Sequence, residues 1–186
     1  MLQELSPAAP PGDDECDAVH DQLQEFVERY QARLTRYSEQ ILRDRPDLAG
    51  DVVQETFLKL HRALTEKATI ANISSWLYRV AHNLAIDVHR RDTRDRRMGE
   101  ELAAAPPVNE HGSIALSKVE SQNLAVSEMQ NLPIEQRQVL LLKIIEGMTL
   151  QQVADTTGQK ISTVHYRLGA GLKALASRLQ KKGVVQ

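Results

Sequence analysis

LQQVADTTGQKISTVHYRLGAGLKAL, residues 150–175, is the segment that decides the fold of this 186-residue chain. Ala154, Gly158 and Val164 stand at the spacing of a helix-turn-helix. A small residue is needed where the two helices touch, and the turn needs a residue that tolerates a positive φ. A branched apolar residue in the second helix, here Val164, must pack against the first helix. The segment therefore predicts a helix-turn-helix, whose second helix can enter the major groove of DNA.

The composition favours helices along the rest of the chain. Only seven residues are aromatic, so packed cores must rest on Leu, Ile, Val and Ala, and no alternating apolar run indicates a strand. We therefore predict an all-α protein with two small helical domains joined by a flexible linker. The second domain contains the helix-turn-helix.

Shifts in composition divide the chain into four segments. Residues 1–17 are rich in Pro, Ala and acidic residues, which is typical of a disordered acidic leader. A first helical domain is expected over residues 18–97. Pro, Asn and Gly interrupt the apolar pattern over residues 98–122, which indicates a linker, and a second helical domain follows over residues 123–182.

Polar residues mark the expected helix starts in the first domain. Asp47 or Asp51 is expected to cap the helix that follows Pro46, because a short side-chain acceptor satisfies the free N–H groups of the first turn. Ser74 or Ser75 is expected to do the same for the next helix.

In the second domain a helix is expected to begin near Pro133 and to stop at Gly147. Thr149 then caps the first helix of the helix-turn-helix, and Gln152 stands at the third helical position of a capping box.

Charge is distributed unevenly, although the net charge is only −2. Residues 1–28 hold eight acids and no Lys or Arg. Residues 79–97 hold six Arg against three Asp, and residues 160–182 hold six Lys or Arg and no acid. Binding to phosphates depends on local potential more than on the total charge, so the two basic segments favour a nucleic-acid partner.

Several function classes are disfavoured. The sequence has no phosphate-binding glycine loop, nucleophile elbow or paired metal-ligand motif, so we expect neither an enzyme nor a cofactor or metal site. His82 and His89 share a helical face without a third ligand, which favours surface histidines. The single Cys16, and the lack of a signal peptide or a membrane-spanning apolar segment, favour a cytoplasmic protein without membrane insertion.

Two helical faces are candidates for binding a partner. One carries Asp51, Gln54, Glu55 and Leu58, and it is either an ordinary solvated face or a docking face for a partner helix. The other mixes aromatic and basic side chains with an amide, which suits unpaired bases and their phosphates: Trp76, Tyr78, Arg79, His82, Asn83, Asp87, Arg90 and Arg91. Burial of Trp76 and Tyr78 in the core is the alternative interpretation.

Two stretches of the chain resemble an extracytoplasmic-function sigma factor, the two-domain promoter-recognition subunit of bacterial RNA polymerase. DLAGDVVQETFLKLHRAL (residues 47–64) and ISSWLYRVAHNLAIDVHRRDTRDRR (73–97) resemble the second conserved region of that family. LPIEQRQVLLLKIIEGMTLQQVADTTGQKISTVHYRL (132–168) resembles the fourth region. The resemblance implies a protein that binds core RNA polymerase and directs promoter recognition, strand opening and transcription initiation.

The resemblance also implies a role for three sets of residues. The β′ coiled coil of the polymerase, whose β subunit is a further partner, would bind Asp51, Gln54, Glu55 and Leu58. The opened −10 element, with an extruded base, would be held by Trp76, Arg79, His82, Asn83, Asp87, Arg90, Arg91 and Arg94. The duplex −35 element would be recognised by Lys160, Ser162, Thr163, His165, Tyr166, Arg167 and Lys173. An anti-sigma factor is an additional partner that the resemblance implies.

The run Gly169-Ala170-Gly171-Leu172 departs from the basic, Ala-containing run that the family has here. Each glycine inside a helix costs about 1 kcal/mol relative to Ala, so we expect a helix that is kinked or ends near Leu168. Two other functions stay open: a dimeric helix-turn-helix transcription regulator that binds duplex DNA, and an interaction protein whose helix-turn-helix no longer binds DNA.

Overall fold

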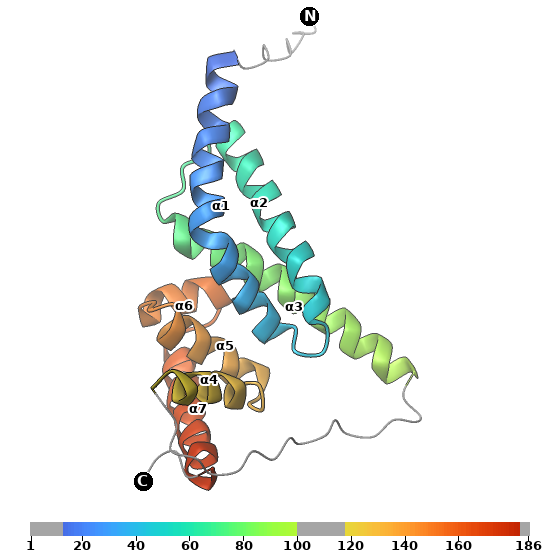
Figure 1. Ribbon diagram of the computed structural model, residues 1–186, viewed down its shortest axis with the longest axis vertical. Helices are drawn as coiled ribbons and strands as arrows, with labels where there is room; N and C mark the ends of the chain where they lie inside the picture. The colour runs from blue at the N-terminus through green and yellow to red at the C-terminus, as the bar shows by residue number, and fades with distance from the viewer. Residues whose placement is uncertain (1–12, 100–117, 183–186) are drawn as a thin grey trace, which may run out of the picture.

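The computed structural model describes residues 13–99 and 118–182, and within these ranges the chain is helical and contains no strand (Figure 1). The predicted all-α fold with two helical domains is thus confirmed. The first domain comprises α1 (Asp13–Ile41), the short 3₁₀ helix η1 (Pro46–Leu48), α2 (Ala49–Thr65) and α3 (Ile73–Gly99). The second comprises α4 (Lys118–Met129), α5 (Ile134–Leu140), the π-helical turn η2 (Leu141–Ile145), α6 (Leu150–Thr157) and α7 (Ile161–Lys181).

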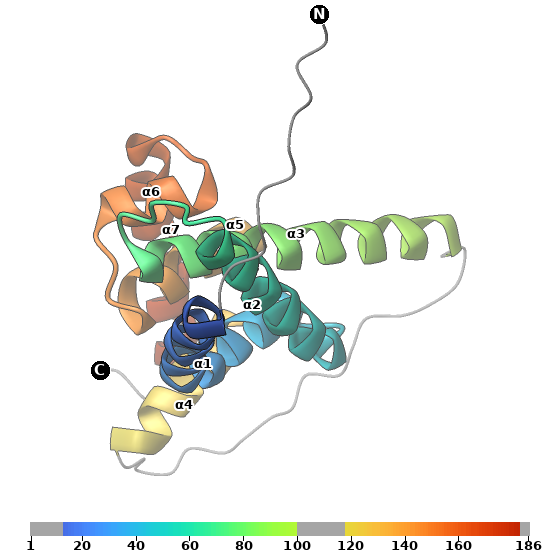
Figure 2. The same ribbon diagram turned by 90° about the horizontal axis from the view of Figure 1, so that it is seen from above.

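In the first domain α1 and α2 lie side by side, and α3 packs against both of them (Figures 1 and 2). Their shared core is mainly aliphatic, as the composition predicts, and it contains three buried tyrosines, Tyr30, Tyr37 and Tyr78. The most deeply buried side chains here include Leu34, Tyr37, Ile41, Leu60, Leu77 and Tyr78.

The start of α1 differs from the expected boundary. Because α1 begins at Asp13, residues 13–17 of the acidic leader are helical, whereas residues 1–12 lie outside the described part of the chain. The segment between the helices of the two domains is shorter than the expected linker of residues 98–122, because α3 continues to Gly99 and α4 begins at Lys118.

The expected caps of α2 and α3 are wrong. Neither aspartate caps α2, because η1 leads directly into it and leaves Leu48 at the cap position without a side-chain hydrogen bond. Asn72, one residue before α3, takes the place of the two serines as its cap. Its Oδ1 accepts a hydrogen bond of 2.8 Å from the N–H of Ser75.

The helix-turn-helix is confirmed in detail. Thr149 Oγ1 accepts a hydrogen bond from the N–H of Gln152, whose Oε1 accepts one from the N–H of Thr149, so the capping box is complete. Gly158 adopts a φ of 66° in the turn. Ala154 and Val164 are buried where α6 and α7 pack together.

The helix before the helix-turn-helix has the expected ends. Pro133 occupies the cap position just before α5, and Gly147 has a φ of 70° after the last turn. Between them the helix changes from α to π geometry at η2, which sequence reasoning did not predict.

Helix α7 is continuous from Ile161 to Lys181, so the expected kink or early end near Leu168 is wrong. The physical reason lies in Gly171, which faces α5. A Cβ atom at this position would lie 3.0 Å from Leu140 Cδ1 and 3.3 Å from Gln136 Cβ, so the missing side chain permits α5 and α7 to approach closely. At Gly169 a Cβ atom would meet no neighbouring atom within 4 Å.

The two domains contact each other, chiefly where α6 packs against α3 and where α5 meets α1 (Figure 1). The second half of α3 extends beyond the helices packed on its first half (Figure 2). Among residues 13–99 and 118–182, no helix is both long and apolar enough to cross a membrane.

The two glycines of α7 should respond oppositely to substitution. Gly169→Ala should raise the free energy of unfolding by roughly 1 kcal/mol, because Ala has the higher helix propensity and its Cβ meets no neighbour. Gly171→Ala should leave it unchanged or lower it, because overpacking a core costs about 1–3 kcal/mol. Urea titrations of both variants measure the difference. Equal stabilisation by both substitutions would contradict the tight contact with Leu140.

Candidate nucleic-acid interface

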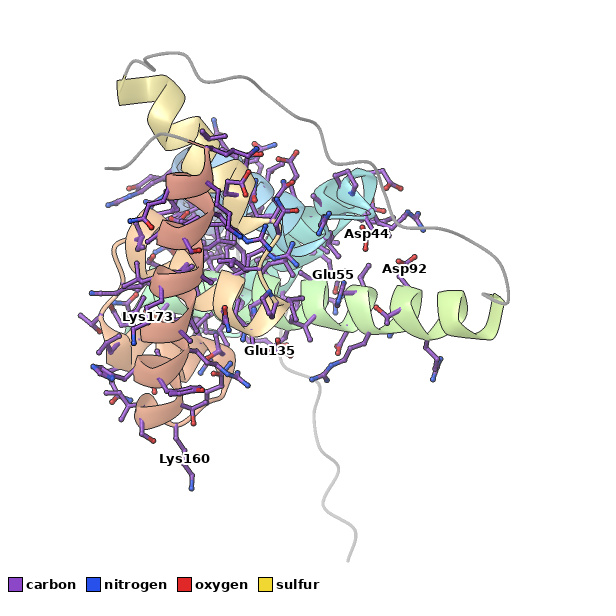
Figure 3. All side chains as sticks on the ribbon, turned by 90° about the horizontal axis from the view of Figure 1, so that it is seen from below. Asp44, Glu55, Asp92, Glu135, Lys160 and Lys173 are labelled. Atoms are coloured by element: carbon purple, nitrogen blue, oxygen red, sulfur yellow. The ribbon has the colours of Figure 1, made fainter. Side chains whose placement is uncertain are left out.

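Helix α7 presents a polar face to solvent. Tyr166 on this face is 75% exposed, although it is a large aromatic side chain. The structure brings the predicted −35 residues together at the beginning of α7 and along it: Lys160, Ser162, His165, Tyr166 and Lys173 are exposed, and Thr163 and Arg167 are half-buried. Figure 3 shows Lys160 projecting from the start of the helix and Lys173 lying further along it.

Helix α3 has a second polar face, which is rich in arginine. Arg79, Asn83, Asp87, Arg90 and Arg94 recur at intervals of three or four residues, so they lie along one side of the helix, and all five are exposed. Arg91, next to this line, is also exposed. Trp76 at its beginning is half-buried and packs against the core, as the alternative interpretation holds.

Tyr78 lies on the opposite side of α3 and is fully buried. Its ring meets that of Tyr37 edge to face, with the ring centroids 5.4 Å apart. Its hydroxyl group donates a short hydrogen bond to Glu146 of the second domain. The core interpretation of Tyr78 is therefore supported.

The surface position expected for His82 is wrong, because this side chain is buried. Its Nδ1 lies 2.8 Å from the hydroxyl oxygen of Tyr37. A signal in the sequence was available: His82 stands four residues after Tyr78 and three before Ala85, inside the apolar stripe of its helix.

Burial keeps the His82 ring neutral. Burial, together with the smaller effect of the nearby Arg90 charge, lowers the pKa of His82 to about 4. Burial likewise raises the pKa of Tyr37, so its hydroxyl stays protonated. The hydrogen bond between the Tyr37 hydroxyl and Nδ1 of His82 therefore joins two neutral groups.

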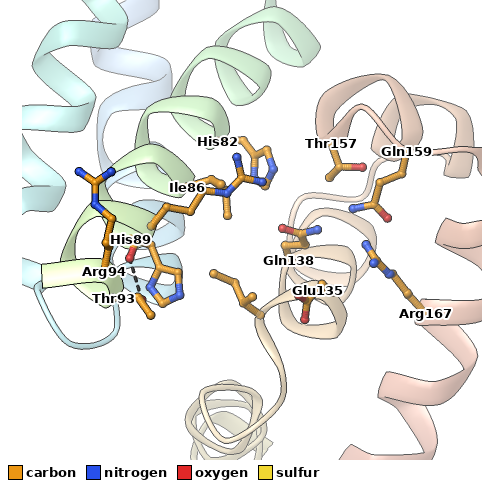
Figure 4. Close-up of a pocket in the computed structure, with 12 residues that line it drawn as sticks. His82, Ile86, His89, Thr93, Arg94, Glu135, Gln138, Thr157, Gln159 and Arg167 are labelled. Atoms are coloured by element: carbon orange, nitrogen blue, oxygen red, sulfur yellow. Dashed lines mark hydrogen bonds between the residues drawn. The ribbon is translucent and has the colours of Figure 1, made fainter. Parts of the chain in front are cut away.

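A cleft of about 600 Å³ separates α3 from the second domain, and basic side chains line it from both sides (Figure 4). His89, Arg90 and Arg94 come from α3, Arg167 comes from α7, and Glu135 is the acidic residue of the lining. Because the basic side chains of the lining outnumber its one carboxylate, the cleft has the chemistry of an anion-binding surface. Across the described ranges no three potential metal ligands gather into a group.

The predicted docking face on α2 is largely exposed. Asp51, Gln54 and Leu58 are exposed, and the Glu55 carboxylate lies 3.4 Å from Lys59 Nζ on the same helix. Three of these residues border a groove of about 720 Å³ between α1 and α2. Sequence reasoning missed the contribution of α1, whose apolar residues Leu23 and Val27, spaced at i and i+4, line the groove.

Two family models match the chain. "Sigma-70 region 2" matches residues 26–95, and "Sigma-70, region 4" matches residues 124–175, so each model lies in one of the two domains. The chain is 28% identical over 141 residues to the ECF RNA polymerase sigma factor SigW of Bacillus subtilis, covering 71% of this chain and 75% of the relative. It is 27% identical over 179 residues to the ECF sigma factor SigE of Mycolicibacterium smegmatis, covering 92% and 69%. The chain belongs to the extracytoplasmic-function sigma factors.

Solved structures share the fold of this sigma factor. The sigma factor RpoE from Bartonella quintana superposes with a TM-score of 0.67 at 21% identity, covering 86% of this chain and 97% of that chain. CnrH superposes with a TM-score of 0.60, also at 21% identity, covering 90% and 95%.

The family assignment gives the function in outline. As a sigma factor, the protein binds core RNA polymerase and recognises promoters in transcription initiation. The alternative of a dimeric helix-turn-helix regulator is not favoured, because the region 2 model matches residues 26–95, which make up most of the first domain.

The buried His82 should make the stability of the protein depend on pH. The pKa of His82 is about 4 in the folded protein and 6.5 in the unfolded chain, so only the unfolded chain takes up this proton between those values. The free energy of unfolding should therefore fall as the pH decreases from 6.5 to 4, by about 3 kcal/mol from this group. Urea titrations across this range measure the loss.

Two histidine variants separate this effect from the titration of other groups. His82→Gln should lose this part of the pH dependence, whereas His165→Gln, which changes an exposed histidine, should keep it. A pH dependence in His82→Gln that matches the wild-type protein would show that the ring is not held neutral.

Proposed function

We propose that this sigma factor holds the opened −10 element on α3, recognises the −35 element as duplex with α7, and docks on the β′ coiled coil of core polymerase through α2. The observation that carries the proposal is the pair of exposed polar faces on α3 and α7, which lie in separate domains. The two functional units are residues 18–97 and 123–182, with a leader over residues 1–17 and a linker over 98–122. The helical residues 13–17, 98–99 and 118–122 extend these units into the leader and the linker.

On α3, Asn83 and the arginines before and after it act on an unpaired strand. Extruding a base from a duplex costs a few kcal/mol, so the protein must offset the lost stacking with contacts to the base and its phosphates. The exposed amide of Asn83 offers a donor and an acceptor to a base edge, while Arg79, Arg90, Arg91 and Arg94 offer cations to the phosphates. Half-buried Trp76 and exposed Asp87 border this surface, and His82 contributes from inside by supporting the helix.

On α7, the residues near the start of the helix contact the major groove. Recognition helices contact base edges with their N-terminal part, where this chain has Ser162, Thr163, His165 and Tyr166. Lys160, Arg167 and Lys173 supply positive charge for the flanking phosphates.

On α2, polymerase docking uses a mixed apolar and acidic surface. Leu58 is 46% exposed, which suits an apolar contact, and Asp51, Gln54 and Glu55 surround it with polar groups. The groove beside it would admit side chains of the β′ coiled coil.

We further propose that the protein acts in the cytoplasm by binding rather than by catalysis, and that an anti-sigma factor controls it. RpoE from Bartonella quintana was solved in complex with the anti-sigma factor NepR, and CnrH with the cytosolic domain of CnrY. These two complexes support regulation of the same kind here.

Transcription with purified core polymerase tests the proposal. On a library of duplex promoters, the protein should produce promoter-dependent transcripts that core polymerase alone does not make. Asn83→Ala should reduce initiation at least tenfold on duplex templates and much less on templates opened beforehand at the −10 element, because only the former require base capture. DNA binding without any initiation in the presence of core polymerase would refute the sigma-factor mechanism, and equal loss on both templates would refute the role of Asn83.

The docking surface is tested by reversing one charge. Glu55→Arg should weaken binding to core polymerase at least tenfold in a pull-down titration, because it places a cation within the acidic docking face. Glu25→Arg is a matched control, since Glu25 is exposed on α1 and lies two residues from Leu23, on the other side of the helix. Equal affinity of the Glu55 and Glu25 variants would place the polymerase contact elsewhere.

A further inference from the structure

The cleft between α3 and the second domain carries cations on both of its walls. One side of α3 forms the first wall, because its lining residues recur at intervals of three or four positions over 82–93. Arg90 and Arg94 stand one turn apart on this wall. Figure 4 shows Arg167 of α7 on the facing wall. A ligand in the cleft would therefore meet guanidinium groups from two domains.

These arginines are available to a ligand. Within residues 13–99 and 118–182, none of the three forms an ion pair, whereas Arg33 of α1 pairs with Glu146 at 2.7 Å. Glu135 is the acidic residue of the lining, so the cleft has an excess of positive charge. A guanidinium group binds phosphate oxygens through two parallel hydrogen bonds. Three such groups on two walls favour a ligand with more than one phosphate group.

Neutral polar atoms of the same lining lack partners. Among the described residues, Oε1 of Gln159 is buried and has no hydrogen-bond partner. His82 is 5% exposed, and its Nδ1 is hydrogen-bonded to the Tyr37 hydroxyl, so Nε2 is the ring nitrogen without a partner in the described part of the chain. Leaving a buried polar atom unpaired costs free energy. Both atoms therefore favour a ligand that carries hydrogen-bonding groups besides its phosphates.

The cleft is larger than phosphate groups alone require. Its volume of about 600 Å³ falls within the range of about 300–1,000 Å³ that small-molecule sites span. Ile86 on α3 and Ile134 on α5 add apolar surface from both walls, which an organic ring can contact. Phosphates, hydrogen-bonding groups and a ring occur together in a nucleotide.

We propose that this cleft is a binding site for a nucleotide that carries two or more phosphates. The phosphates bind Arg90 and Arg94 from the first domain and Arg167 from the second. The sugar and the base contact Gln159 and the two isoleucines. Glu135 opposes the phosphates and weakens their binding.

Occupancy of the site inhibits promoter binding. Under the proposed function, Arg90 and Arg94 hold phosphates of the −10 element and Arg167 holds those of the −35 element. A guanidinium group that is bound to the nucleotide cannot also bind DNA, so the nucleotide competes with the promoter. This inhibition rests on the proposed function, whereas the binding site itself does not.

Calorimetric titration of the free, full-length protein tests the site. ADP, GDP, CDP and UDP are titrated in turn, and at least one should bind at one site per chain, at least tenfold more tightly than pyrophosphate. Absence of binding by all four would overturn the proposal. Equal affinity for pyrophosphate would overturn the assignment to a nucleotide.

Two substitutions in the lining should change the affinity in opposite directions. Gln159→Glu should weaken binding of the nucleotide at least tenfold, because it adds a carboxylate to the cleft, and Glu135→Gln should strengthen it at least threefold. Gln180→Glu is the matched control, since it makes the same charge change at an exposed position near the end of α7 and should leave the affinity unchanged. Far-UV circular dichroism checks that each variant remains folded. Equal affinities of the Gln159 and Gln180 variants would place the nucleotide outside the cleft.

Arginine variants distinguish a site with two walls from general attraction to a basic surface. Arg94→Ala and Arg167→Ala, on opposite walls, should each weaken nucleotide binding at least tenfold. Arg91→Ala, next to the lining but outside it, should change the affinity less than twofold. Equal weakening by all three variants would overturn the cleft as the site.

Open-complex formation tests the inhibition. The protein is combined with core polymerase and a promoter that carries a fluorescent base in its −10 element, without nucleoside triphosphates. The nucleoside diphosphate that binds most tightly should reduce the signal, and Gln159→Glu should raise the half-inhibitory concentration at least tenfold. Full open-complex formation at a saturating concentration would overturn the inhibition. Calorimetric binding without open complexes, even when no nucleotide is added, would refute the proposed function and leave the nucleotide site standing.

Discussion

Leu77, Tyr78, Ala81 and Ala85 are fully buried along one side of α3, and the position of this helix determines the rest of the molecule. The two alanines let α3 pack closely, while the leucine and the tyrosine fill the space between it and its neighbours. Because successive residues are 100° apart, burying this side turns the arginine-rich side outwards. The candidate DNA surface on α3 is thus a consequence of how the first domain packs.

The electrostatics of that surface depend on one buried ring. A charged His82 would add a cation beneath Arg90, where burial makes charge costly. The hydrogen bond between the Tyr37 hydroxyl and Nδ1 satisfies the neutral ring instead, so the positive charge of α3 is carried by its exposed arginines. The chain has a net charge of −2 despite this basic helix because acidic residues lie elsewhere, with eight of them in residues 1–28.

The features that could be predicted from sequence are those whose partners lie close together in the chain. The capping box of Thr149 and the left-handed turn at Gly158 involve neighbours within a few residues, and both occur as predicted. The apolar stripe around His82 could have indicated its burial, but its hydrogen-bond partner, Tyr37, lies 45 residues away and no local pattern identifies it. The residue pair Arg33 and Glu146 is separated by 113 residues, so no local pattern reveals it.

Gly171 shows that helix propensity alone also fails to predict a feature that depends on tertiary contacts. Propensity alone predicts a weak point in α7, because glycine disfavours a helix. In the folded protein the close contact with Leu140 on α5 supplies the compensating packing, and the helix continues. Tertiary contacts therefore determine that α7 continues, where helix propensity alone predicts an interruption.

The π-helical turn η2 explains how a carboxylate comes to lie at the domain contact. A π turn holds an additional residue, which rotates everything after it relative to a regular α-helix. Leu140, Leu141 and Leu142 remain buried before this rotation takes effect, whereas Glu146 comes to face Arg33 and Tyr78.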